Sequence, residues 1–328
     1  MAARPETAVV AAAVEEIHNG LASLELPSEP ATLYDPVRYI LASGGKRIRP
    51  VLVLLTAEAF GGKEARQRAL PAALACEVFH NFTLVHDDIM DHAATRRGRP
   101  TVHRTWDEAT AILSGDVMMG LAYELLSQAG TDDLAALMRP FHTMVRRLCE
   151  GQALDLDFET RDAVSVEDYL HMIDGKTGAL LELTLDLGAL LGGAEAPARQ
   201  ALQRAGHALG RAFQIQDDLL DLTADSAAWG KTIGGDLMEG KKTYLLLRAL
   251  ERAEGEEQAW FARALDGLPP SDISDARARM EALGVLAEAT EEVRRYTQLG
   301  NDGLAVIPKS PAGAALRDLA LGLARRAV

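Results

Sequence analysis

The sequence predicts an all-α protein, and three observations support this fold class. Apolar residues recur at three- and four-residue spacing, which is the period of an amphipathic helix. Alanine and leucine are abundant whereas aromatic residues make up only 5% of the chain, and β-branched residues hardly ever alternate with polar ones. We therefore expect one domain over residues 1–328, built as a bundle of roughly a dozen helices by ordinary helix lengths.

The composition and charge limit the classes to which the protein can belong. Hydrophobic residues make up 48% and charged residues 25%, as in a soluble globular protein rather than a disordered one. The formal net charge of −14 argues against a nucleic-acid partner, which needs a broad basic surface. The two cysteines form no CxxC pair, so we expect neither a disulfide scaffold nor a structural zinc site. We also expect the protein to lie in a reducing compartment.

The first predicted helix lies near the N-terminus. Ala8–Val14 is apolar, but Glu15 and Glu16 follow at once and no basic segment precedes it. This pattern differs from a secretion signal, and no apolar run approaches the ~18 residues of a membrane span. We therefore expect a cytoplasmic protein without stable membrane insertion.

Further segments carry the helical period, and glycine, proline or polar clusters separate them. The breaks include Gly61-Gly62, Arg97–Pro100, Gly192-Gly193 and Gly234-Gly235. No Gly/Ser/Pro-rich linker divides the chain, which supports a single domain. The predicted helices are Val51–Phe60, Leu70–Met90, Ala109–Leu126, Leu134–Cys149, Gly178–Leu191, Ala198–Leu222 and Tyr244–Ala253.

Two DDxxD motifs, Asp87–Asp91 and Asp217–Asp221, lie in apolar helical segments. Residues i and i+4 share a helix face, so Asp87 projects with Asp91, and Asp217 projects with Asp221. One such motif is readily explained as an exposed acidic surface. Two of them, inside otherwise apolar helices and without basic residues at i+4, favour a cation site instead. Paired carboxylates suit Mg²⁺, which completes its coordination shell with water and phosphate oxygens.

Clusters of basic residues occur at four places along the chain. They could bind a phosphate group that shares the predicted Mg²⁺. Arginine forms bidentate contacts with phosphate oxygens, and lysine supplies a mobile charge. Any one cluster alone is more often a solvated loop, so the arrangement of four around two carboxylate motifs is the informative feature. The clusters are Gly44–Pro50 (GGKRIRP), which opens a helix, Arg96–Pro100 (RRGRP), Lys176-Thr177 in a break between helices, and Lys231 with Lys241-Lys242.

A di-iron oxidoreductase is the alternative from another functional class. Glu-x-x-His occurs at Glu15/His18 and at Glu77/His80, and two such motifs can build a di-iron site in a helical bundle. This alternative leaves the aspartate motifs and the basic clusters unexplained. His80 also shares a helix stripe with Asp87, which favours a role facing phosphate.

From GGKRIRP at residue 44 to GKKT at residue 240, these motifs resemble the trans-type polyprenyl diphosphate synthases. The resemblance covers most of the chain and includes all the family's motifs in order. Class I terpene cyclases share the first aspartate motif but neither GGKRxRP nor the second DDxxD. The resemblance implies an isoprenoid synthase-like bundle around a central cavity, a homodimer, small isoprenoid diphosphates as substrates, and Mg²⁺, with roughly three ions around the diphosphate.

The resemblance also implies a role for each motif residue in ionisation of an allylic diphosphate, condensation with isopentenyl diphosphate and loss of a proton. Asp87, Asp91 and Asp217 would hold Mg²⁺, and Asp88, Asp218 and Asp221 would ligate or support it. The predicted allylic diphosphate-binding residues are Arg96, Lys176, Thr177, Gln214, Asp217, Lys231 and Lys241, of which Lys176 and Lys231 also count as catalytic. The predicted isopentenyl diphosphate-binding residues are Gly45, Lys46, Arg49, His80 and Arg97.

Product length depends on what closes the cavity for the growing chain. Phe82 lies five residues before Asp87 and roughly 140° around the helix axis, so a plain core phenylalanine remains an alternative. The resemblance implies that an aromatic residue here acts as a floor, next to the small Thr83. With no insertion in the first DDxxD, it implies geranylgeranyl diphosphate (C20) from dimethylallyl, geranyl or farnesyl diphosphate, with farnesyl diphosphate (C15) as the alternative.

Overall fold

Helices dominate the chain in the computed structural model, which describes residues 5–224 and 233–324, so the all-α prediction is confirmed. The chain forms two compact units. Unit 1 comprises Met1–Phe141, Thr184–Gln200 and Ile307–Leu319, and unit 2 comprises His142–Leu183, Ala201–Val306 and Ala320–Val328. The expectation that the whole chain is a single domain stays a prediction.

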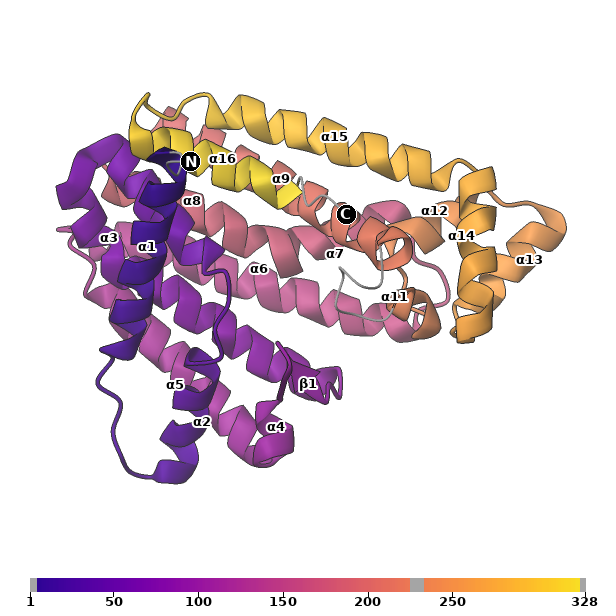
Figure 1. The fold of residues 1–328 in the computed structure, drawn as a ribbon, viewed down its shortest axis with the longest axis horizontal. Helices are drawn as coiled ribbons and strands as arrows, with labels where there is room; N and C mark the ends of the chain where they lie inside the picture. Colours follow the sequence, from indigo (N-terminus) through magenta and orange to yellow (C-terminus); the bar gives the residue numbers. More distant parts are fainter. Residues whose placement is uncertain (1–4, 225–232, 325–328) are drawn as a thin grey trace. The chain divides into compact units, whose positions relative to one another are not determined.

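Unit 1 is built around one long helix, α3 (Ile48–Met90), which packs against α1 (Pro5–Ala22) and α5 (Glu108–Ser127) (Figure 1). Its fully buried side chains include Leu52, Leu55 and Phe79 on α3. The other elements of this part of the chain are α2 (Ala31–Leu41), β1 (Thr95–Arg96), β2 (Arg99–Pro100), α4 (Val102–Thr105) and the start of α6 (Leu134–Thr160).

The expected break at Gly61-Gly62 is a kink within α3. Gly62 has a φ of 71°, a backbone conformation that glycine adopts without steric cost, and the helix resumes directly after it. A Cβ atom on Gly61 would lie 2.7 Å from the carbonyl oxygen of Gly192, so the close approach of these two backbones requires glycine. The predicted helices Val51–Phe60 and Leu70–Met90 are therefore two arms of one kinked helix.

The expected break at Arg97–Pro100 contains a small antiparallel hairpin that the sequence did not indicate. Strands β1 and β2 pair Arg96 with Arg99, and Gly98 turns the chain with a φ of 74°. The Arg99 guanidinium lies 4.0 Å from the ring centroid of Tyr39, whose hydroxyl donates to the Pro100 carbonyl at 2.8 Å. These contacts attach the hairpin to α2.

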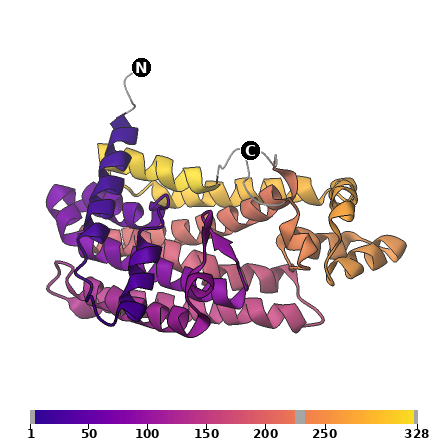
Figure 2. The same ribbon diagram turned by 60° about the horizontal axis from the view of Figure 1, so that its bottom comes forward.

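Unit 2 is also helical, and α6, α8, α9 and α16 contribute residues to both units. Figure 2 shows the same helices from a second direction. Within this unit α15 packs against α12 and α14. The remaining elements are α7 (Val166–Ile173), the π-helix η1 (Asp174–Gly178), α8 (Ala179–Leu191), α9 (Ala196–Thr223), α11 (Gly235–Met238), α12 (Tyr244–Arg252), α13 (Gly255–Ala264), the 3₁₀ turn η2 (Pro270–Asp272), α14 (Ile273–Ala282), α15 (Val285–Leu304) and α16 (Pro311–Ala324).

Two predicted boundaries are wrong. The helix expected at Leu134–Cys149 continues to Thr160, because the glycine at position 151 does not end it. The break expected around Lys176-Thr177 is instead a π-helical turn that joins α7 directly to α8. In this turn a Cβ on Gly175 would lie 2.5 Å from the carbonyl oxygen of Arg147, so glycine here permits close helix packing rather than a chain break.

Helix α5 is long and apolar enough to cross a membrane by length and composition alone, contrary to the expectation that no segment approaches this limit. It packs against α2, α3 and α4 within unit 1, and Asp107 caps its N-terminus by accepting from the Thr110 amide. Its buried side chains, among them Met118 and Leu126, belong to the core of unit 1. These contacts place the buried face of α5 in the core of unit 1.

A buried ion pair links the start of α3 to its C-terminal arm, and its loss should destabilise the protein. Arg47 Nη1 donates to Glu77 Oε1 at 2.5 Å, with both side chains almost completely buried. We expect Glu77→Gln to lower the free energy of unfolding by about 3 kcal/mol, because Arg47 would keep a buried, unpaired charge. Urea denaturation measures this change.

The matched control is Arg294→Gln, which removes an exposed ion pair with Glu291. It should change the free energy of unfolding by less than about 1 kcal/mol. Equal effects of the two substitutions would contradict the importance of the buried pair.

Candidate active site

The first DDxxD motif ends α3 in unit 1, and its three carboxylates have different environments. Asp88 is buried and accepts a 2.6 Å hydrogen bond from Arg96 Nε. Burial raises the pKa of Asp88, and the charge and hydrogen bond of Arg96 oppose that rise. Asp87 is half-buried and Asp91 is exposed. The outer carboxylates are therefore the ones that an incoming ligand can reach, while the middle one is held by the chain itself.

The first residues of the GGKRIRP segment form a loop before α3, and this loop contacts Arg97 of the hairpin. Gly44 and Gly45 have φ values of 78° and 131°, in the region that favours glycine. A Cβ on Gly45 would lie 3.0 Å from the guanidinium carbon of Arg97. Arg97 donates to the Gly44 carbonyl and, at 3.2 Å, to Ser43 Oγ. Gly45 and Arg97, both predicted to bind isopentenyl diphosphate, thus lie against each other.

His80 and Arg49 add to the same basic cluster. Arg49 Nη1 lies 3.2 Å from His80 Nε2. Burial, and then the charges of Arg49 and Arg97, hold the pKa of His80 well below its usual range, so the imidazole is neutral. Lys46 is exposed at the edge of this loop. The structure thus brings together, within unit 1, the residues predicted to bind isopentenyl diphosphate.

Arg47 belongs to the same motif but serves the fold. It pairs with Glu77 and donates to the Leu41 carbonyl at 2.8 Å. This explains why only some basic residues of GGKRIRP are available to a ligand.

Phe82 lies within a row of aromatic rings in unit 1. Its ring centroid is 5.2 Å from that of Phe79 and 4.8 Å from that of His86. Phe79 in turn contacts Phe141, 5.5 Å away between centroids. Thr83 is buried and donates to the His80 carbonyl at 2.8 Å. The packing fixes the Phe82 ring, which suits either a core residue or a rigid floor.

The second DDxxD motif ends α9 in unit 2 and repeats the arrangement of the first. Asp218 is buried, and it accepts hydrogen bonds from Tyr169 Oη at 2.6 Å, the Tyr244 amide at 3.0 Å and Gln214 Nε2 at 3.2 Å. Burial, and then the charge of Asp236, raise the pKa of Asp218 to about 8 despite these donors. A cation bound nearby would offset both effects. Asp217 is only half-buried.

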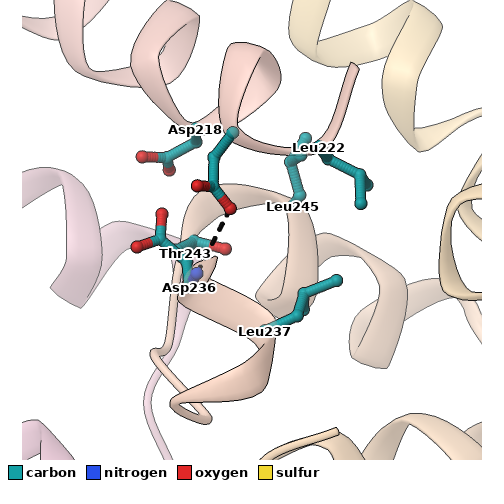
Figure 3. A pocket seen from close by; sticks show the side chains of 7 residues that line it. Asp218, Leu222, Asp236, Leu237, Thr243 and Leu245 are labelled. Atoms are coloured by element: carbon teal, nitrogen blue, oxygen red, sulfur yellow. Dashed lines mark hydrogen bonds between the residues drawn. The ribbon is translucent and has the colours of Figure 1, made fainter. Parts of the chain in front are cut away.

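Asp236 is a neighbour of the second motif that the sequence analysis missed. Its amide donates to Asp221 Oδ2 at 3.2 Å (Figure 3). The side chains that line the small cavity beside it come from α9, α11 and the start of α12 (Figure 3). They are Asp218, Asp221, Leu222, Asp236, Leu237, Thr243 and Leu245. Asp236 lies outside both DDxxD motifs, so its sequence position carries no signal for this contact.

Lys176 and Thr177 lie on η1 and connect it to the second motif. Thr177 Oγ1 donates to Gln214 Oε1 at 3.2 Å, and Gln214 donates onward to Asp218. Lys176 Nζ lies 2.5 Å from Asp155 Oδ2, a partner that no sequence motif indicated. The predicted allylic diphosphate-binding residues Lys176, Thr177 and Gln214 thus stand in one connected group within unit 2.

The remaining predicted lysines have different environments. Lys242 Nζ donates to the carbonyls of Phe158 and Arg161 at the end of α6, so it caps that helix. Lys241 is exposed and lies 2.8 Å from a Glu239 carboxylate oxygen. Lys231 lies outside the described residues.

The donor set fits Mg²⁺ better than iron. Among residues 5–224 and 233–324, no three His, Cys, Asp or Glu side chains converge into a complete metal site. Mg²⁺ does not need three converging side chains, because it binds one or two carboxylates and takes its other ligands from phosphate oxygens and water. Of the alternative di-iron ligands, Glu77 pairs with Arg47 and His80 contacts Arg49.

Known proteins are similar to this chain in both sequence and fold. It is 45% identical to the geranylgeranyl diphosphate synthase of Methanosarcina mazei over 69% of each chain. It is 39% identical to the geranylfarnesyl diphosphate synthase of Natronomonas pharaonis over 95% of each. The solved structure of a geranylgeranyl pyrophosphate synthetase from Pyrococcus horikoshii Ot3 matches with a TM-score of 0.90 and 36% identity over 98% of each chain. Residues 30–283 match the family described as Polyprenyl synthetase. The chain therefore belongs to the polyprenyl synthetase family, and its fold is that of the isoprenoid synthases.

Proposed function

We propose that this protein is a short-chain prenyltransferase that condenses isopentenyl diphosphate with allylic diphosphates and releases geranylgeranyl diphosphate. The observation that carries the proposal is the shared design of the two DDxxD motifs. In each, the middle carboxylate is buried and hydrogen-bonded, whereas the first is only partly covered. Relatives named as geranylgeranyl diphosphate synthases support the C20 product.

In this proposal the chain binds and orients two diphosphates. Asp87, Asp91 and Asp217 would hold Mg²⁺, with Asp88, Asp218 and Asp221 in support. When bound, Mg²⁺ neutralises the charge that grows on the departing diphosphate. The residues that would bind the allylic diphosphate are Arg96, Lys176, Thr177, Gln214, Lys231 and Lys241.

The basic cluster of unit 1 would bind the second substrate. Arg49 and Arg97 supply fixed positive charge to isopentenyl diphosphate, and neutral His80 supplies a hydrogen bond without adding charge. Lys46 at the exposed edge would close the site, and Gly45 leaves room for Arg97.

The reaction needs no protein nucleophile. The carbon–oxygen bond of the allylic substrate breaks, and its electron pair leaves with the diphosphate. The isopentenyl double bond then attacks the allylic cation to form a carbon–carbon bond. Loss of a proton, for which the departed diphosphate is a suitable base, creates the new trans double bond. The side chains contribute through fixed charges at the site of ionisation.

A homodimer in the cytoplasm completes the proposal. Helix α5 exposes Ile112 and Leu113, at 46% and 59% of their surface, next to each other in the sequence. Covering this apolar surface with a second copy would remove it from water.

Removing the outer carboxylates should abolish turnover. We expect Asp87→Ala and Asp217→Ala each to lower kcat by at least about 10³-fold, because diphosphate departure would lose its fixed charge stabilisation. Condensation assays with labelled isopentenyl diphosphate and Mg²⁺ measure this, and circular dichroism checks the fold. The exposed Asp132→Ala is the control and should retain activity. Near-normal turnover in both motif variants would overturn the assignment, as would full activity after chelation of divalent metal.

Product length should depend on Phe82. The wild-type protein should give a C20 alcohol, after dephosphorylation, from dimethylallyl, geranyl and farnesyl diphosphates alike. Phe82→Ala should lengthen the product, whereas Phe82→Tyr keeps the ring and should leave it unchanged. An unaltered product in Phe82→Ala would place the floor elsewhere. Wild-type product of C15, or of C25 as the Natronomonas relative is named for, would contradict the C20 assignment.

The apolar surface of α5 should control association. We expect light scattering to give the mass of two chains for the wild type and of one chain for Leu113→Asp, because a carboxylate in an apolar interface loses its hydration. Leu299→Asp, at a comparably exposed leucine of α15, is the control and should leave the mass unchanged. A monomeric wild-type protein would contradict the homodimer.

A further inference from the structure

A cluster of ion pairs in unit 2 holds the first residue of η1. Arg211 on α9 binds the Asp174 carboxylate with two hydrogen bonds, from Nε to Oδ1 at 2.7 Å and from Nη2 to Oδ2 at 2.6 Å. This fork is the strongest geometry that an arginine and a carboxylate adopt. Arg211 is itself held by Tyr296 Oη, 2.8 Å from its Nη1.

A second arginine holds the backbone of the same residue. Arg147 Nη2 donates to the Asp174 carbonyl at 3.2 Å, and Arg147 also binds both oxygens of Glu182, at 2.6 and 2.9 Å. His207 Nδ1 lies 3.3 Å from Glu182 Oε1 and 3.6 Å from Asp174 Oδ1. Burial would raise the pKa of Glu182, but the hydrogen bonds of His207 and Arg147 lower it, so the carboxylate stays charged.

Glycines permit the turn to approach closely the two helices that carry these arginines. A Cβ on Gly151 of α6 would lie 2.2 Å from the Lys176 amide nitrogen, and a Cβ on Gly210 of α9 would lie 2.9 Å from Gly178 Cα. The two glycines therefore allow the backbone of η1 to pack closely against α6 and α9. Such turns are rare within α-helical segments and frequently occur at functional sites.

Helix α9 carries both the ion-pair cluster and the second aspartate motif. Arg211 precedes Gln214 by about one turn and Asp218 by about two turns, so all three share a helix stripe. Arg211 binds the first residue of η1, and Gln214 binds Thr177 near its end. A displacement of Asp174 would therefore move Lys176 and Thr177 relative to Gln214 and Asp218.

We propose that Asp174, Arg211 and Arg147 are positioning residues, which fasten η1 so that Lys176 and Thr177 meet an allylic diphosphate in register with the second aspartate motif. This role rests on the proposed function, and no ligand contact is required of the three residues themselves.

Two substitutions test the positioning role. Asp174→Asn removes the charge and keeps the shape, and Arg211→Lys keeps the charge and removes the fork. The matched control is Arg199→Lys, since Arg199 forms an equivalent fork with Asp186, at 2.7 and 2.9 Å, in unit 1. Each of the three variants loses one forked ion pair. Only the pair lost in Asp174→Asn and Arg211→Lys includes a residue of η1.

Amide hydrogen exchange of the ligand-free proteins measures whether the turn is fastened. We expect amides of residues 174–178 to exchange at least about tenfold faster in Asp174→Asn and Arg211→Lys than in the wild type or in Arg199→Lys. Unchanged protection in the two variants would overturn the proposal, and equal loss of protection in the control would reduce it to general destabilisation.

Steady-state kinetics then measures the consequence for the substrate. We expect the two variants to raise KM for the allylic diphosphate by about tenfold and to leave KM for isopentenyl diphosphate within about twofold, since only one substrate meets η1. Equal shifts in both KM values, or the same shift in Arg199→Lys, would overturn the positioning role. An inactive wild-type protein would overturn the proposed function instead, and the exchange experiment would still decide whether the cluster fastens the turn.

Discussion

Each aspartate motif places one carboxylate away from water, and burial of a charge is unfavourable unless hydrogen bonds and opposite charges compensate it. Asp88 receives Arg96 from the hairpin, and Asp218 receives Tyr169, Gln214 and the Tyr244 amide. The elements that supply these donors are therefore fixed against the end of α3 or of α9. The outer aspartates Asp87, Asp91, Asp217 and Asp221 stay at least partly exposed.

Basic residues that are buried also need hydrogen bonds or opposite charges to compensate the loss of water. A buried arginine needs a carboxylate or carbonyl partner, and Arg47 uses Glu77 and the Leu41 carbonyl. Arg97 donates to the Gly44 carbonyl and to Ser43 Oγ, and Arg49 lies against His80, which burial and the charges of both arginines keep neutral. A dianionic ligand would relieve the repulsion between them, which agrees with the proposed binding of isopentenyl diphosphate.

In unit 2, two arginines bind carboxylates of the chain itself. Arg147 pairs with Glu182 and Arg211 pairs with Asp174, the first residue of the π-helical turn. In the proposed function, the lysine and threonine of that turn are the groups that bind a phosphate.

The sequence by itself determined the helical fold class, the two DDxxD motifs and the basic clusters, because helical period and i,i+4 spacing are local properties. It also predicted that Gly45, Arg49, His80 and Arg97 belong together, through resemblance to a family. Only the tertiary structure revealed Asp155 beside Lys176, Asp236 beside Asp221, and Arg211 beside Asp174. These partners lie 15 or more residues apart in the chain, and their meeting depends on how helices pack. The π-helical turn was mistaken for a break for the same reason, since its glycines serve close packing between helices that no local pattern reveals.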